Sequence, residues 1–82
     1  MVKKMVSLNS IDKVKKFNKL TCDADVDVDL VNGRYTVDAK SILGIFSLDL
    51  SKPIELHIHV NSNADEIEAA GYLEVIANFL VE

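Results

Sequence analysis

The chain has 82 residues, of which 49% are hydrophobic and 27% are charged, and this composition excludes a disordered protein and predicts one folded domain over residues 1–82. No apolar run approaches the ~18 residues that a membrane-spanning helix needs, so we expect no membrane insertion. The one cysteine, Cys22, cannot form an intrachain disulfide, which favours a cytoplasmic protein.

The net charge of −4 conceals an uneven distribution along the chain. Residues 1–20 contain six lysines and one aspartate, whereas residues 21–82 contain three basic and twelve acidic residues. A basic end on an acidic body can steer an acidic partner. Arginine occurs once, at Arg34, and no aromatic residues alternate with the lysines, so we expect no nucleic-acid binding.

The N-terminal third predicts a strand followed by a helix. Residues 1–8 are typical of a strand. Asn9 or Ser10 is expected to cap a helix over residues 10–21, with Asp12 placed three residues after Asn9 as in a capping box. The expected core face of this helix recurs every three residues at Ile11, Val14, Phe17 and Leu20.

A hairpin is predicted next. Residues 23–31 are expected to form a strand, because aspartate and apolar residues alternate from Asp23 to Leu30, which indicates one buried face and an outer stripe of Asp23, Asp25, Asp27 and Asp29. The dipeptide Asn32-Gly33 is a strong signal for a tight hairpin turn, and residues 35–38 form the returning strand.

The C-terminal half predicts a short helix, a strand and a long helix. Residues 40–48 form the short helix, with Ser41 as its N-cap and with Gly44 weakening it. Residues 54–60 alternate as a strand, and Asn63 with Glu66 marks the capping-box start of a helix over residues 64–80. The expected core face of that helix consists of Ile67, Ala70, Leu73, Ala77 and Leu80.

The element order is therefore strand, helix, strand, strand, short helix, strand, helix (βαββαβα). Each strand hides one face only, so the expected fold class is α+β: an open-faced two-layer sandwich with a four-stranded antiparallel sheet and three helices on one face.

The element order and the stretch Lys-Ser-Ile-Leu-Gly-Ile-Phe-Ser-Leu at residues 40–48 resemble HPr, the histidine-containing phosphocarrier family of the bacterial sugar phosphotransferase system. The resemblance implies a phosphocarrier histidine at the entrance of the first helix, but that position falls on Asn9 or Ser10. The arginine that neutralises the phosphoryl group falls on Ile11 or Asp12. The family also contains a histidine-lacking paralogue, the catabolite-repression HPr.

The resemblance implies a second phosphorylation site at Ser41, which an ATP-dependent serine kinase modifies as a regulatory mark. It also implies that Ile42, Leu43 and Phe46 belong to the surface that docks partners of the phosphotransferase system. The sequence is consistent with this docking surface. In a two-turn helix, Ile45 and Leu48 are expected to face the sheet, and the other apolar side chains are then exposed to solvent. The Lys13, Lys15, Lys16 and Lys19 cluster is either a solvated helix face or a contact for an acidic partner, with Lys15 and Lys16 as the residues assigned to partner binding.

His57 and His59 share the outer face of the last strand with Glu55 and match no position of the family motif. If this strand lies beside the aspartate strand, the two histidines are weak candidates for a transition-metal site, and Asp–His pairing across the strands is the favoured alternative. We expect no metal, no cofactor and no catalytic residue.

Three interpretations remain open. The first is a regulatory or protein-interacting HPr-like protein that uses Ser41 and is not an enzyme. The second is a phosphocarrier with an unconventional acceptor near Asn9 or Ser10. The third is a degenerate relative with an unrelated binding role.

Overall fold

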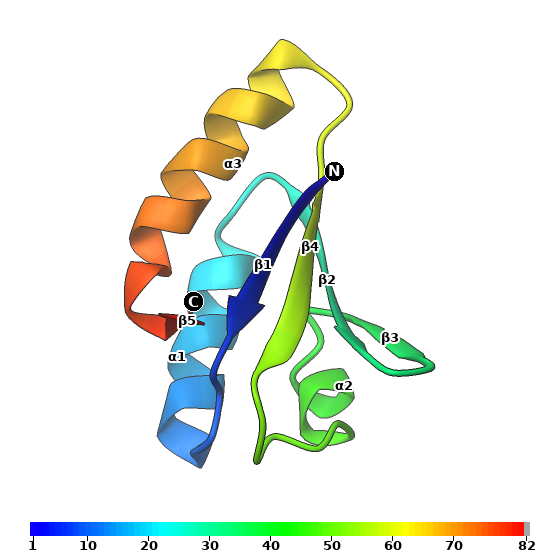
Figure 1. Cartoon of the computed structure of the whole chain (residues 1–82). Coiled ribbons are helices and arrows are strands. Elements are labelled where there is room, and N and C mark those ends of the chain that lie inside the picture. Colours follow the sequence, from blue (N-terminus) through cyan, green and yellow to red (C-terminus); the bar gives the residue numbers. More distant parts are fainter. Residues whose placement is uncertain (82) are drawn as a thin grey trace.

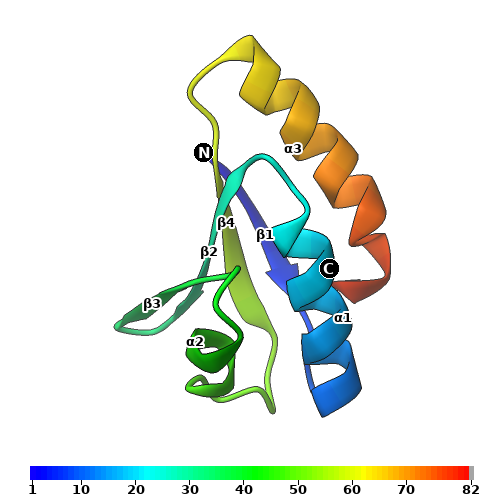
Figure 2. The same ribbon diagram turned by 180° about the vertical axis from the view of Figure 1, so that it is seen from behind.

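Five antiparallel strands form one sheet in the order β3-β2-β4-β1-β5, and the helices lie on one face of it (Figures 1 and 2). This computed structural model describes residues 1–81. Along the chain, the elements are β1 (Val2–Val6), α1 (Ile11–Cys22), β2 (Asp27–Asn32), β3 (Tyr35–Asp38), α2 (Ile42–Phe46), β4 (Ile54–His59), α3 (Asn63–Val75), the 3-10 turn η1 (Ala77–Phe79) and β5 (Leu80–Val81).

The core lies between the sheet and the helices. The central strands β2 and β4 pair over five residues and present their apolar residues to the helices. The helices complete the core with Val14 and Phe17 of α1 and Ile45 of α2. The fully buried residues of the two central strands, each at most 2% exposed, are Val28, Leu30, Ile54, Leu56 and Ile58. The alternation expected for these strands is therefore confirmed.

The cap and the buried face of α1 differ from the expected ones. Ser10 is the N-cap, because its hydroxyl accepts a hydrogen bond from the backbone N–H of Lys13, and Asn9 lies outside the helix. Ile11 is 63% exposed, which contradicts its expected place in the core. Steps of three residues turn a helix about 60° short of a full circle, so four such residues spread over about half of its circumference. Ile11 lies at one edge of that spread, and the buried residues are Val14, Phe17 and Thr21.

The hairpin also differs in detail. β2 begins at Asp27 rather than Asp23, since Asp23 instead ends α1 with its backbone N–H bonded to the carbonyl of Lys19. Asn32 and Tyr35 are paired residues of the two strands, so Gly33 and Arg34 form the turn. Gly33 has a φ of 62°, and among residues 1–81 no other residue has a positive φ. Glycine at the first turn position is the requirement of a type II′ hairpin.

The C-terminal helix is shorter than expected and buries a different face. Its N-cap is Ser62, whose hydroxyl accepts from the N–H of Asp65, and it ends at Val75. The buried residues are Ala69, Tyr72 and Ile76. The expected core face is wrong at Ile67, which is 73% exposed, and at the exposed Ala70 and Ala77, while Leu73 and Leu80 are half-buried.

A fifth strand takes the place of the last expected helical turn. η1 redirects the chain after α3, and Leu80 and Val81 then pair with Val6 and Met5 of β1. The sheet therefore has one strand more than the four expected, and the part of that strand within residues 1–81 is two residues long.

Candidate functional site

Ser41 begins the short helix α2 and is exposed to solvent. Its hydroxyl accepts a hydrogen bond of 3.2 Å from the N–H of Gly44, which confirms the expected N-cap, and its own N–H donates to the carbonyl of Asp38. A Cβ on Gly44 would lie 3.3 Å from both Ser41 Oγ and Val37 Cβ. Gly44 has a low helix propensity, but its missing side chain leaves the space that Ser41 Oγ occupies.

The apolar residues of α2 divide between the core and the solvent. Ile45 is fully buried and Leu48 is 8% exposed, as expected for side chains that face the sheet. Leu43 is 80% exposed and Phe46 is 41% exposed, whereas Ile42 is half-buried against the core. Two large apolar side chains therefore meet solvent within five residues of Ser41.

Lys40 fixes the start of α2 against α1, a contact that no sequence pattern indicates. The Asn18 amide donates to the carbonyl of Lys40 at 3.0 Å, and Cys22 Sγ donates to the same oxygen at 3.4 Å. Lys40 Nζ donates to the carbonyl of Ala24 at 3.0 Å. These contacts tie the residue before Ser41 to α1 and to the loop that follows it.

Lys15 and Lys16, the two lysines expected to bind a partner, lie on different sides of α1. Lys15 is one turn before Asn18 on the stripe that also contains Cys22, so it shares the side that faces α2. Lys16 lines a hollow between α1 and α3. Both side chains are exposed.

Asn9 and Ser10, the expected positions of the phosphocarrier histidine, are both exposed at the entrance of α1. The hydroxyl of Ser10 is bonded to the N–H of Lys13, and the helix continues with Ile11 and Asp12. An amide or an aliphatic hydroxyl does not form the reactive phosphoramidate that an imidazole forms, and histidine occurs in this chain only at positions 57 and 59.

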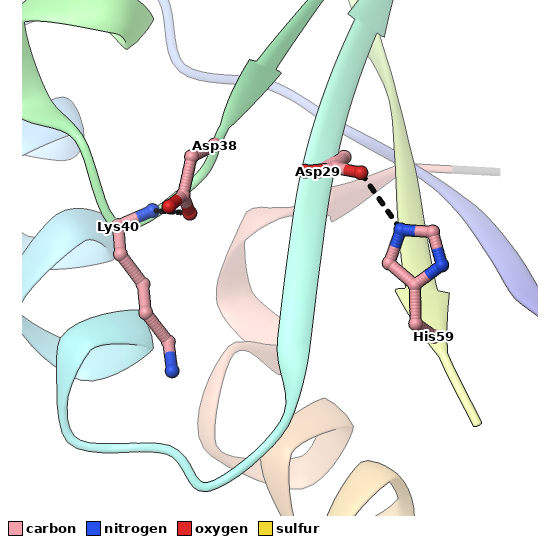
Figure 3. A network of polar contacts seen from close by, with 4 residues as sticks. All are labelled: Asp29, Asp38, Lys40 and His59. Carbon is pink, nitrogen blue, oxygen red and sulfur yellow. Dashed lines mark hydrogen bonds and ion pairs between the residues drawn. The ribbon is translucent and has the colours of Figure 1, made fainter. Parts of the chain in front are cut away.

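The two histidines are bonded to carboxylates on the outer face of the sheet. His59 Nε2 lies 2.7 Å from Asp29 Oδ2 on the neighbouring strand β2, which confirms the expected pairing across strands (Figure 3). His57 Nε2 instead lies 2.7 Å from Glu55 Oε1 of its own strand. Within residues 1–81, no three His, Cys, Asp or Glu side chains converge closely enough to hold a metal ion.

Asp38 and Lys40 form a pair of their own, on the other side of β2 from His59 (Figure 3). The N–H of Lys40 donates to Asp38 Oδ1 at 2.9 Å, and no bond joins this pair to Asp29 and His59 in Figure 3. The carboxylate of Asp38 therefore shapes the turn that leads into Ser41 and α2.

A family model described as "PTS HPr component phosphorylation site" matches residues 12–80. The chain belongs to the HPr family. This confirms the family that residues 40–48 indicated, and HPr proteins are phosphocarrier components of the phosphotransferase system rather than catalysts. The matched region of this HPr chain contains Ser41 and all of α2, and it begins after Asn9 and Ser10.

Two solved structures confirm the HPr fold. HPr-C-His from Thermoanaerobacter tengcongensis is 18% identical, with a TM-score of 0.71 over 95% of this chain and 93% of that chain. The phosphocarrier protein HPr from Bacillus anthracis str. Ames is 23% identical, with a TM-score of 0.68 over 90% of this chain and 94% of that chain. A search of curated protein sequences finds no match. No helix within residues 1–81 has the length and apolarity to cross a membrane.

Proposed function

We propose that this HPr-family chain is a regulatory, protein-interacting member of the phosphotransferase system that is switched by phosphorylation of Ser41. In this proposal, Ile42, Leu43 and Phe46 dock the partner and Lys15 steers it. One observation carries the proposal. Ser41 is exposed at the start of α2, and Leu43 and Phe46 of the same helix are also exposed.

The position of Ser41 suits a phosphate. A phosphoserine at an N-cap meets backbone N–H groups that have no partner within the helix, and the positive end of the helix dipole favours its charge. Phosphorylation replaces the Ser41 O–H bond with an O–P bond to the γ-phosphoryl group of ATP and releases ADP and a proton. The ester keeps α2 in place because Ile45 remains packed in the core.

The effect of the phosphate follows from what surrounds it. It adds close to two negative charges beside two exposed apolar side chains, in a region where the Asp38 carboxylate is already negative. A partner that presents apolar residues with an acidic rim is then repelled, and one that presents arginine is attracted. The modification therefore exchanges one class of partner for another.

The absence of histidine from residues 1–56 separates this role from that of a histidine phosphocarrier. A phosphoserine is a stable ester and a poor donor for onward transfer, so it serves as a mark rather than as a carrier. The second candidate, a carrier that uses Ser10, is supported only by the exposure of that hydroxyl at the start of α1.

The test of the switch is the intact mass after incubation with ATP and an HPr serine kinase. We expect one added phosphate in the wild type and none in Ser41→Ala. Ser47→Ala is the matched control, because Ser47 is an exposed serine at the other end of the same helix. An unmodified wild type, or a phosphate that persists in Ser41→Ala, contradicts the proposed switch.

The carrier alternative is tested with phosphoenolpyruvate and the general enzyme of the phosphotransferase system. Labelling of the wild type that is absent in Ser10→Ala supports the carrier, and the absence of labelling excludes it. Asn9→Ala is the control for a general disturbance at the entrance of α1.

The docking surface is tested with the same general enzyme by following amide shifts of the labelled HPr chain. We expect Leu43→Ser to weaken binding at least about tenfold, which corresponds to ~1.4 kcal/mol. Tyr35→Ser is the matched control, since Tyr35 is similarly exposed but lies on β3 rather than on one of the three helices. Equal effects of the two variants would mean that α2 is not the contact.

A further inference from the structure

A groove runs between α1 and α3, away from Ser41. The two helices are antiparallel here, because the start of α1 meets the end of α3 and the reverse holds at the other end. Two hollows of about 440 and 510 Å³ lie along the seam and share Leu20 and Val75 as lining residues, so they form one continuous groove. Figure 2 shows both helices on the same side of the sheet.

The α3 side of the groove presents exposed apolar side chains. Ile67 is 73% exposed and Val75 is 54% exposed, and they lie on one face of α3 with Gly71 between them. A Cβ on Gly71 would meet no atom within 4 Å, so this glycine serves no close packing inside the molecule. A glycine inside a helix costs about 1 kcal/mol relative to alanine. The missing side chain of Gly71 therefore keeps the groove wide.

The charges are separated along the groove. Lys13, Lys16 and Lys19 line one end, and no acidic residue among residues 1–81 lines it. Asp23 and Glu68 line the other end, and the described part of the chain places no basic residue there. An occupant that neutralises both ends must therefore carry negative charge at one end and positive charge at the other.

We propose that the groove between α1 and α3 binds an amphipathic helix of a protein partner, with its acidic N-terminal turn over the lysines and its basic C-terminal turn over Asp23 and Glu68. The apolar side of that helix covers Leu20, Ile67 and Val75. This binding surface is additional to the proposed function at Ser41 and does not depend on it.

The direction and the length of the occupant follow from helix physics. Acidic residues stabilise the first turn of a helix and basic residues its last turn, so the charge order that suits the groove also suits a helix laid in this one direction. From Lys13 to Asp23 the helix α1 rises by about 15 Å, which corresponds to about ten residues of a bound helix. Such a helix presents anchors at positions i, i+3, i+4 and i+7.

The test uses two designed 14-residue peptides that are held helical by the same side-chain staple. One carries glutamates in its first turn, leucines along one face and lysines in its last turn, and the other has these charges exchanged. Titration of the isotope-labelled chain is expected to shift amides of α1 and α3 in a saturable way with the first peptide. The second peptide is expected to bind at least tenfold more weakly.

Two matched pairs of variants assign the binding to the groove. Gly71→Gln fills the groove and is expected to weaken binding at least tenfold, while Ala70→Gln, an exposed neighbour outside the lining, leaves binding unchanged. Lys16→Gln is expected to weaken binding about two- to fivefold, the size of an exposed ion pair, whereas Lys15→Gln on the other side of α1 does not.

Four results overturn the proposal. They are the absence of saturable shifts, equal binding of the two peptides, equal losses in Gly71→Gln and Ala70→Gln, and dilution-dependent shifts of the same amides without peptide. The last result would mean that a second copy of the chain fills the groove.

Discussion

At the scale of single residues, one pair of hydroxyls stands out because it is buried among apolar side chains. Thr21 is fully buried and Tyr72 is 4% exposed, and their oxygens lie 2.7 Å apart. Burial raises the pKa of Tyr72 to about 12, and the hydrogen bond with Thr21 opposes this rise only in part. The pair joins α1 to α3, and each hydroxyl satisfies the other.

Replacing Tyr72 with phenylalanine removes one partner of this bond. We expect Tyr72→Phe to lower the free energy of unfolding by about 1–3 kcal/mol, because the hydroxyl of Thr21 loses its partner inside the core. Urea unfolding measures the change. The double variant Tyr72→Phe with Thr21→Val is expected to recover most of the loss, and a single variant as stable as the wild type would contradict the argument.

The raised pKa of Tyr72 also predicts how stability changes in alkali. The unfolded tyrosine ionises near pH 10 and the folded one near pH 12. The contribution of this phenol is therefore fully present below about pH 10 and is lost as the pH rises through about 12. The expected loss, about 2–3 kcal/mol, should be seen in urea unfolding curves of the wild type and not of Tyr72→Phe. Tyr35→Phe is the control, since Tyr35 is 71% exposed, and an equal alkaline loss in Tyr72→Phe would contradict the assignment.

At the scale of elements, the sequence predicts what depends on neighbouring residues. The cap of α2 by Ser41 and the inward side chains of Ile45 and Leu48 follow from spacings within one or two helical turns, and both are confirmed. The contact of Asn18 with Lys40 joins residues 22 positions apart and leaves no periodic pattern. The sequence therefore located Ser41 and its apolar neighbours but not the contact that holds them in place.

The helix α3 shows why a buried face can be misjudged. Apolar residues occur around most of its circumference and form two possible core faces. One contains Ile67 and Ala70, and the other contains Ala69, Tyr72 and Ile76. The second face is buried because Tyr72 meets the hydroxyl of Thr21 on α1. A contact 51 residues away in sequence thus selects the face, and the other face provides the exposed Ile67 of the groove.

The contact between Asn18 and Lys40 leads to a prediction about α2. We expect Asn18→Ala to lower the free energy of unfolding by about 1–3 kcal/mol, the usual value of two hydrogen bonds, because the Asn18 amide donates to the carbonyls of both Ala39 and Lys40. Amide exchange should accelerate more at Ile45 of α2 than in β4, because the helix loses part of its attachment to α1. Lys15→Ala, one turn earlier on the same stripe, should change neither quantity, and uniform acceleration in both elements would contradict a local role.

At the scale of the whole molecule, residues 79–81 close the structure around the first strand. β5 pairs with β1, and the carbonyl of Phe79 accepts from the N–H of Ser7 at 2.8 Å. The ring of Phe79 packs edge-on against Phe17, with 5.8 Å between ring centres. Two strand residues are too few to show the alternation of polar and apolar side chains that identifies a strand. The sequence therefore predicts a helix over residues that instead complete the sheet.

This closure predicts that Phe79 supports the whole fold rather than the C-terminal end alone. An 82-residue domain has about 4–12 kcal/mol of stability in total. We expect Phe79→Ala to remove about 2–3 kcal/mol of it, less than for a fully buried phenylalanine because the side chain is partly exposed. Exchange of the Ser7 amide should accelerate in parallel.

Phe46→Ala deletes a ring of the same size from the exposed side of α2 and is expected to cost less than half as much in urea unfolding. Equal costs would mean that Phe79 contributes only its apolar area, and an unchanged Ser7 amide would mean that β1 and the core hold together without the C-terminal strand.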